Sequence, residues 1–286
     1  YQWGAVGILV VGIFLFLYIS SKMLKNAKRS NAAPVENAMF ASWYLMLLPN
    51  VVMSFCYLGE HIEELYGDHE AEAGLWCRTI SFWGVACITA LTFSAVVTSF
   101  VTFKIAKEEV SPAIASVIVG NVMSWVLGLL VGLVFVSGES AVGSGQSSFA
   151  VPALGPFQGL YCCVREQALA QQVPAVQLVL AVMAVGIASQ TLLYFLAAIR
   201  ARTERLAGVV QASLSLYGAT YACWGLLGFS CLMVYSGGDT SFWLSALGAW
   251  FAKLNPVIHS IILAGLVGHY DELAIQPGDP DKLKQH

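Results

Sequence analysis

The stretch that decides the fold stands at the start of the chain, where residues 3–21 read WGAVGILVVGIFLFLYISS and carry no charge. As a helix, this run is long enough to cross the ~30 Å hydrocarbon core of a membrane. A secretory signal peptide is the other interpretation, but the run has no basic leading region. Basic residues follow it instead, at Lys22, Lys25, Lys28 and Arg29. We therefore expect a retained membrane span.

The chain continues with six more apolar runs of similar length. They cover approximately 38–59, 79–105, 112–136, 174–199, 208–235 and 241–267. Of the 286 residues, 58% are hydrophobic and 11% are charged, which suits a multi-pass membrane protein and exceeds what a soluble domain needs to bury. The sequence thus predicts an all-α membrane protein, a seven-transmembrane helix bundle at 1–270 followed by a polar tail at 271–286.

The distribution of charge predicts the orientation of the bundle. Lysine and arginine gather after the first, third and fifth runs and in the tail, whereas the other loops are mainly acidic. By the positive-inside rule, the N-terminus lies outside and the C-terminus inside, so the tail is cytoplasmic. We expect a multi-pass protein of the plasma membrane, whose first partner is the lipid bilayer. Nothing in the sequence indicates binding of nucleic acid.

One ionisable residue lies deep in the last run: Lys253, within WFAKLNPVIH at 250–259. A charge at that depth costs roughly 2.5–3.5 kcal/mol on insertion scales, so intramembrane ionisable residues are functional-site candidates. Lys253 lies ~18 Å from the outer end of its run at 1.5 Å per residue, too deep for the amine to reach either membrane face easily. It is either a cation paired inside the bundle or a desolvated, neutral amine that can form a Schiff base with an aldehyde.

A protonated Schiff base needs a counterion. The interior of the runs offers no Asp or Glu, so the candidate is Glu60, near the outer end of the second run. Beside the lysine, Pro256 removes a helical hydrogen bond near Ala252, and Asn255 can bond the freed carbonyl. Asn255 and Pro256 form either a simple kink or a hinge next to Lys253.

Other residues within the runs have structural or functional interpretations. Trp224, after Cys223, is either a core aromatic or a ligand contact. Ser124, Gly128 and Gly132 form a small-xxx-small pattern that predicts close helix packing. Interhelical hydrogen bonds are expected from four polar residues, Asn50, Asn121, Gln190 and His259.

Three cysteines face the outside in this topology: Cys77, Cys162 and Cys163. An oxidising compartment favours a disulfide from Cys77 to Cys163 or to Cys162, which would hold the loop at 137–173 over the outer end of the bundle. The sequence contains no metal-ligand cluster and no nucleophile spaced to meet a base. We therefore expect neither a metal site nor an enzyme.

Several of these motifs resemble those of a known receptor family. The run 250–253, Trp-Phe-Ala-Lys, resembles the seventh helix of animal-type opsins, and 255–259, Asn-Pro-Val-Ile-His, resembles their Asn-Pro-x-x-Tyr motif. Cys223-Trp224 is similar to the Cys-Trp-x-Pro motif of the sixth helix, and 159–163, Gly-Leu-Tyr-Cys-Cys, is similar to the loop that covers the retinal pocket. The chain thus resembles the rhodopsin-like (class A) seven-transmembrane receptor superfamily, as a divergent animal-type opsin-like member.

The resemblance implies a retinal-binding photoreceptor. Lys253 would form the Schiff base, Trp224 would pack near the polyene, and Glu60 would be the counterion. The loop at 156–163 would cover the pocket, and a G protein is a possible partner. Microbial-type rhodopsins also carry a seventh-helix lysine, but 82–103 of the third run contains no acid for a proton relay.

Two further functional hypotheses remain open. The first is a G-protein-coupled-receptor-like protein for a diffusible ligand, in which Lys253 pairs with an anionic group. Proteins similar to slime-mould cAMP receptors share the topology and the cysteine pair without the lysine. The second is a structural or accessory membrane subunit that no longer signals and belongs to a larger membrane assembly, which the short inner loops favour.

Overall fold

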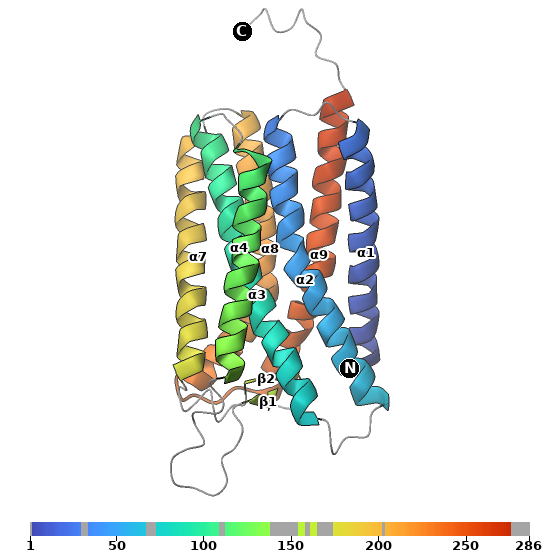
Figure 1. Cartoon of the computed structure of the whole chain (residues 1–286), viewed down its shortest axis with the longest axis vertical. Helices are drawn as coiled ribbons and strands as arrows, with labels where there is room; N and C mark the ends of the chain where they lie inside the picture. The colour runs from blue at the N-terminus through green and yellow to red at the C-terminus, as the bar shows by residue number, and fades with distance from the viewer. Residues whose placement is uncertain are drawn as a thin grey trace, which may run out of the picture.

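The computed structural model describes residues 2–29, 34–66, 73–108, 112–137, 154–157, 161–164, 174–201 and 204–275. Its helices are α1 (Gln2–Arg29), α2 (Pro34–Tyr66), α3 (Ala73–Glu108), α4 (Ile114–Ser137), α7 (Pro174–Arg200), α8 (Glu204–Tyr235) and α9 (Phe242–Ile275). They run side by side along the long axis of the molecule (Figure 1). Within the described residues, seven helices are long and apolar enough to cross a membrane. The prediction of a seven-helix membrane protein is thereby confirmed.

The helices extend beyond the apolar runs that predicted them, because polar residues continue the helical backbone past the membrane-spanning part. The largest differences lie in α1, which continues to Arg29, and in α9, which continues to Ile275. The tail predicted at 271–286 therefore begins with five helical residues. Its remainder, 276–286, lies outside the described residues.

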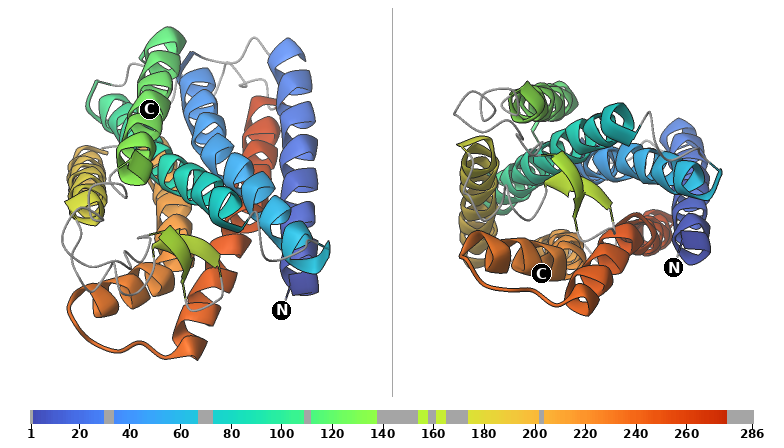
Figure 2. Two further views of the ribbon diagram at one scale, coloured as in Figure 1. Left: turned by 60° about the horizontal axis from the view of Figure 1, so that its bottom comes forward. Right: turned by 90° about the horizontal axis from the view of Figure 1, so that it is seen from below.

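A small hairpin was not expected from the sequence. Strands β1 (Leu154–Phe157) and β2 (Tyr161–Val164) pair antiparallel, with Leu154 opposite Val164 and Phe157 opposite Tyr161. The hairpin contacts α3 and lies across the end of the bundle at which α1 begins (Figure 2). We call this end the hairpin end. The Gly/Ser-rich part of the loop, 138–153, lies outside the described residues.

Helix α3 occupies the middle of the bundle, since it contacts α2, α4, α7 and α8. Helix α1 completes the bundle, since it contacts both α2 and α9. Close packing of α3 against α4 depends on glycine, as the small-xxx-small pattern predicted. A Cβ atom added at Gly128 would collide with the backbone oxygen of Ala86, and one at Gly132 would lie 3.0 Å from that of Phe82. The packing prediction for this stretch is confirmed.

Buried hydroxyl groups join α2, α3 and α8 in the half of the bundle away from the hairpin. The Ser42 hydroxyl donates to Thr98 Oγ1 at 2.7 Å. Ser213 Oγ accepts from two helices, from Trp43 Nε1 at 3.2 Å and from Thr102 Oγ1 at 3.1 Å. Because few donors are available in hydrocarbon, such bonds help to fix which faces of the helices meet.

Replacing Ser213 by alanine should destabilise the protein by about 1 kcal/mol, because the buried Trp43 N–H loses its acceptor. Thr102 is less affected, since its hydroxyl also reaches the Thr98 carbonyl at 2.8 Å. Thermal unfolding in detergent would measure the change. Ser215→Ala is the matched control, because the Ser215 hydroxyl is exposed and, among the described residues, bonds its own helix at Gln211 O, 3.0 Å away. Equal losses in the two variants would contradict the assignment.

Candidate functional site

Lys253 is buried at the contact between α9 and α2, with 2% of its surface exposed. Its Nζ forms a 2.6 Å hydrogen bond with Nε2 of His61 and lies 5.7 Å from the centre of the Tyr57 ring. Tyr57 and His61 are four residues apart, so both project from the same face of α2. The lysine, the imidazole and the aromatic ring together form one compact group, which we call the Lys253 site.

The hydrogen bond limits the protonation of this site. An amine and an imidazole nitrogen can share a hydrogen bond only when one carries the hydrogen and the other offers a lone pair. Either an ammonium at Lys253 donates to a neutral His61, or His61 donates to a neutral amine. His61 is fully buried, so water does not compete for this bond. In both states one nitrogen atom of the site can act as a hydrogen-bond donor toward a bound molecule.

His61 was not selected from the sequence, where it stands among acidic residues and looks like part of a polar helix end. It precedes by one residue the end of the apolar span Ala38–Ile62. The partner of the Lys253 amine thus comes from the last turn of the α2 span. How deep the amine lies in the membrane stays a prediction.

Glu60 is buried next to His61, with 2% of its surface exposed. It is the third residue from the end of the candidate span Ala38–Ile62, near the end of the second run as the sequence placed it. The hydrogen bond of the amine described above goes to His61. The role of Glu60 as a counterion therefore stays a prediction.

Asn255 and Pro256 lie within α9, which continues through the proline as a helix. The sequence suggested that the Asn255 side chain bonds the backbone carbonyl near Ala252, but its amide has another partner. Its Nδ2 donates instead to Asn50 Oδ1 on α2, at 2.7 Å. Asn50 Nδ2 in turn lies 3.1 Å from His259 Nδ1, so the pair belongs to a polar contact between two helices. Whether this position acts as a hinge stays a prediction.

The other intramembrane polar residues differ in whether they form a hydrogen bond with a neighbouring helix. Gln190 of α7 donates from Nε2 to the Thr92 carbonyl of α3 at 3.1 Å, and His259 of α9 lies 2.7 Å from Thr220 Oγ1 of α8. With Asn50, these confirm three of the four expected interhelical bonds. Asn121 is the exception, because its Nδ2 donates to Val117 O in its own helix at 2.9 Å.

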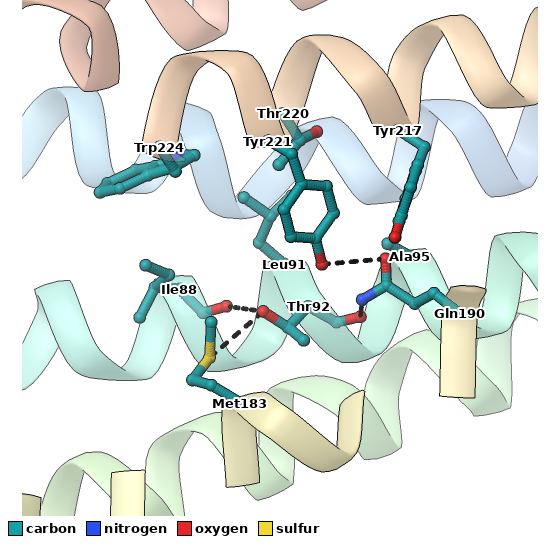
Figure 3. Close-up of a pocket in the computed structure, with 10 residues that line it drawn as sticks. All are labelled: Ile88, Leu91, Thr92, Ala95, Met183, Gln190, Tyr217, Thr220, Tyr221 and Trp224. Carbon is teal, nitrogen blue, oxygen red and sulfur yellow. Dashed lines mark hydrogen bonds between the residues drawn. The ribbon is translucent and has the colours of Figure 1, made fainter. Parts of the chain in front are cut away.

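Trp224 lines a separate cavity of about 40 Å³ between α3, α7 and α8 (Figure 3). Across the cavity, Tyr221 donates to Gln190 Oε1 at 3.3 Å. The lining residues come from three helices and are Ile88, Leu91, Thr92, Ala95, Met183, Gln190, Tyr217, Thr220, Tyr221 and Trp224. Lys253 is not one of them. Trp224 also packs against the cluster that contains Tyr57, the ring beside the Lys253 amine, so the cavity and the Lys253 site adjoin each other.

The cavity beside Trp224 is small for a molecule of the size of retinal. Pockets for ligands of that size enclose roughly 300–1,000 Å³, far more than the cavity beside Trp224. The polyene would also have to join Lys253, which contacts His61 and Tyr57, to a cavity that Lys253 does not line. Binding of retinal by Lys253 and Trp224 stays a prediction.

Cys77 is disulfide-bonded. The side chains of Cys162 and Cys163 lie outside the described residues, so the predicted pairing stays a prediction. Both belong to β2, whose backbone contacts α3, the helix that carries Cys77. The cysteines at 56, 87, 223 and 231 are not disulfide-bonded.

Fold and site together define a multi-pass membrane protein with a buried lysine–histidine pair between two of its seven spans. No model of a known protein family matches the chain, and no curated protein matches it.

Proposed function

We propose that this protein is a receptor-like seven-helix membrane protein whose Lys253 site binds a small ligand with an anionic group. The observation that carries the proposal is the hydrogen bond of 2.6 Å between Lys253 and His61, both of them buried. A carboxylate or phosphate that reaches this pair would gain charge-assisted hydrogen bonds from the amine. A buried amine within the bundle is more costly than a surface one, which favours a functional role for it.

The position of the site supports access from the hairpin end. His61 lies near the end of the α2 span, and the hairpin crosses the same end of the bundle (Figure 2). The basic residues Lys22, Lys104 and Arg200 lie toward the other ends of α1, α3 and α7. By the positive-inside rule that opposite end faces the cytoplasm, so the ligand would arrive from outside.

A retinal-binding photoreceptor is the second candidate, favoured by the presence of a buried primary amine in the last span. It requires a pocket larger than the cavity described above. In this reading, His61 holds the amine in place and can take up the proton that the amine loses.

An accessory subunit of a larger assembly is the third candidate, and it predicts co-purification with other membrane proteins and no ligand at Lys253.

Ligand binding is tested by thermal unfolding of the purified protein in the presence of carboxylates and phosphate esters. We expect at least one such anion to raise the Tm of the wild type, and Lys253→Met to abolish that increase. Lys107→Met is the matched control, because Lys107 is exposed at the other end of α3. An equal increase in wild type and Lys253→Met would contradict an anion site at Lys253.

The photoreceptor candidate has its own test, an absorption spectrum after addition of 11-cis or all-trans retinal. A visible band that hydroxylamine removes, and that is absent from Lys253→Arg, would establish a Schiff base at Lys253. Arginine is the informative replacement because it keeps a cation and cannot form the imine. Lack of a band in the wild type would leave the diffusible ligand as the better proposal.

A further inference from the structure

Basic residues of two neighbouring helices gather at the end of the bundle opposite the hairpin. Lys104 and Lys107 stand near the end of α3, and Arg200 is the last residue of α7. The two helices pack together at this level, where Ala106 of α3 and Ala197 of α7 belong to one buried cluster. Lys107 and Arg200 are exposed, and Lys104 is half-buried. We call these three cations the basic patch.

The two lysines lie on the part of α3 between its contacts with α4 and α7. Val97 packs against α4 at Gly120, and Ala106 packs against α7. At about 100° per residue, these two directions are opposite each other, and Lys107 points between them. Lys107 is also on the side of α3 away from Thr98, which is hydrogen-bonded to α2. The lysines therefore face the membrane between α4 and α7.

Arg200 lies on the side of α7 that turns toward α4. Helix α7 faces α3 through Ala197 and faces α8 through Thr191, whose hydroxyl lies 2.7 Å from that of Tyr217. Seen from Ala197, Thr191 is about 120° round the helix in one sense and Arg200 about 60° in the other. Helix α4 also contacts α7, on the side away from α8 (Figure 2). Arg200 and the lysines thus face the same region from two helices.

An apolar ring continues the patch toward the middle of the membrane. Phe100 precedes Lys104 by one turn of α3 and is 44% exposed. The Lys104 amine lies 6.0 Å from the centre of the Phe100 ring. Lys107 and Arg200 are the last residues of their candidate spans. The cations therefore stand at the level of lipid headgroups, and the ring stands at the level of the acyl chains.

This order of charge and ring matches one kind of molecule. Lysine and arginine beside a membrane attract anionic lipids, which are concentrated in the cytoplasmic leaflet. The positive-inside rule places this end of the bundle at that leaflet. An acidic protein segment or a free phosphate would use the cations and leave the Phe100 ring unused. A lipid uses both.

We propose that the basic patch binds the headgroup of an anionic phospholipid, with one acyl chain packed on Phe100 between α4 and α7. The site shares no residue with the Lys253 site. The inference therefore does not rest on the function proposed above.

Native mass spectrometry of the full-length protein in detergent tests the proposal, because it counts bound lipid molecules. The probes are phosphatidylserine and phosphatidylcholine with the same acyl chains, and glycerophosphoserine, which is the anionic headgroup without chains. We expect phosphatidylserine to bind at least about 5-fold more tightly than phosphatidylcholine, the contribution of one cation near a lipid surface. Glycerophosphoserine should bind more weakly than phosphatidylserine, because it lacks the chain.

Lys107→Gln and Arg200→Gln each remove one exposed cation. Each should weaken the binding of phosphatidylserine about 5-fold and leave that of phosphatidylcholine unchanged. Lys22→Gln is the matched control, because it removes a cation at the same end of the bundle from α1, which contacts α2 and α9. This variant should change neither affinity. Phe100→Ala keeps every cation and should weaken both phospholipids by the same factor.

Cations at the C-terminal ends of helices also interact with the helix dipole, so a purely structural role would change stability without changing lipid binding. Affinities are therefore compared among variants that keep the thermal transition of the wild type. Equal binding of the two phospholipids would overturn the inference and leave the patch to water or an acidic protein. Equal binding of phosphatidylserine and glycerophosphoserine would instead indicate a site for free anions. An equal loss in Lys22→Gln and Lys107→Gln would reduce the effect to the general positive charge of this end. Unchanged lipid binding in Phe100→Ala would remove the acyl chain from the site, and this variant keeps the test decisive if the cation variants do not fold.

Discussion

Replacing Gly248 by valine is expected to lower the free energy of unfolding by about 3 kcal/mol or more. This is a large effect for a single substitution. At this position α9 meets the backbone of α8. A Cβ atom at Gly248 would lie 2.7 Å from Leu227 N, 2.9 Å from Leu227 Cα and 3.0 Å from Leu226 C. Because these are backbone atoms, no side chain can rotate away, and the two helices have to separate. Thermal unfolding in detergent measures the loss.

Gly228→Val is the matched control for Gly248→Val. Gly228 lies on α8, and no described heavy atom lies within 4 Å of the Cβ that a substitution would add. Valine is also a better helix former than glycine, so this variant should unfold at the wild-type temperature or above it. Similar destabilisation of both variants would show that the effect comes from β-branched residues in these helices and not from the contact of α8 with α9.

The spans could be predicted from the sequence because membrane insertion depends on the length and hydrophobicity of each run alone. The ends of the helices could not, since helical hydrogen bonding continues past the apolar part, as it does at Ile275. The strands of the hairpin were also missed, because each is only four residues long and has no alternation to mark it. The contact of α3 with α4 was predictable, since Gly128 and Gly132 lie four residues apart on one face.

The candidate site was predictable only in part. A lysine in an apolar run is conspicuous, so Lys253 was found, and it is buried. Its partner depends on how α2 and α9 are rotated about their axes, which hydropathy does not determine, and His61 was missed for that reason. The packing of Trp224 against the cluster that contains Tyr57 could not be predicted for the same reason, because helix rotation determines which neighbours each residue faces.

In the hydrogen bonds around His259, each donor and each acceptor can be assigned. Asn50 Oδ1 accepts from Asn255, which leaves Asn50 Nδ2 to donate to His259 Nδ1. With Nδ1 acting as an acceptor, the hydrogen of the neutral imidazole is assigned to Nε2. From there it reaches Thr220 Oγ1 at 2.7 Å and Leu216 O at 3.1 Å on α8. One chain of donors thus runs from α9 through α2 and back through α9 to α8.

Asn50→Leu should therefore be destabilising by about 2 kcal/mol or more, since it leaves both the Asn255 amide and His259 Nδ1 buried without their partner. The expected decrease in Tm is several degrees, at roughly 2–4 °C per kcal/mol for a chain of this size. Asn121→Leu is the same substitution at an equally buried site, where the amide donates only within its own helix. Within the described residues, Asn121 Oδ1 is buried without a donor, so leucine there removes an unfavourable group and should leave the Tm unchanged or raise it. If Asn121→Leu lowered the Tm as much as Asn50→Leu, the loss would reflect the removal of any buried amide, and the chain through His259 would have no special part in joining α2, α8 and α9.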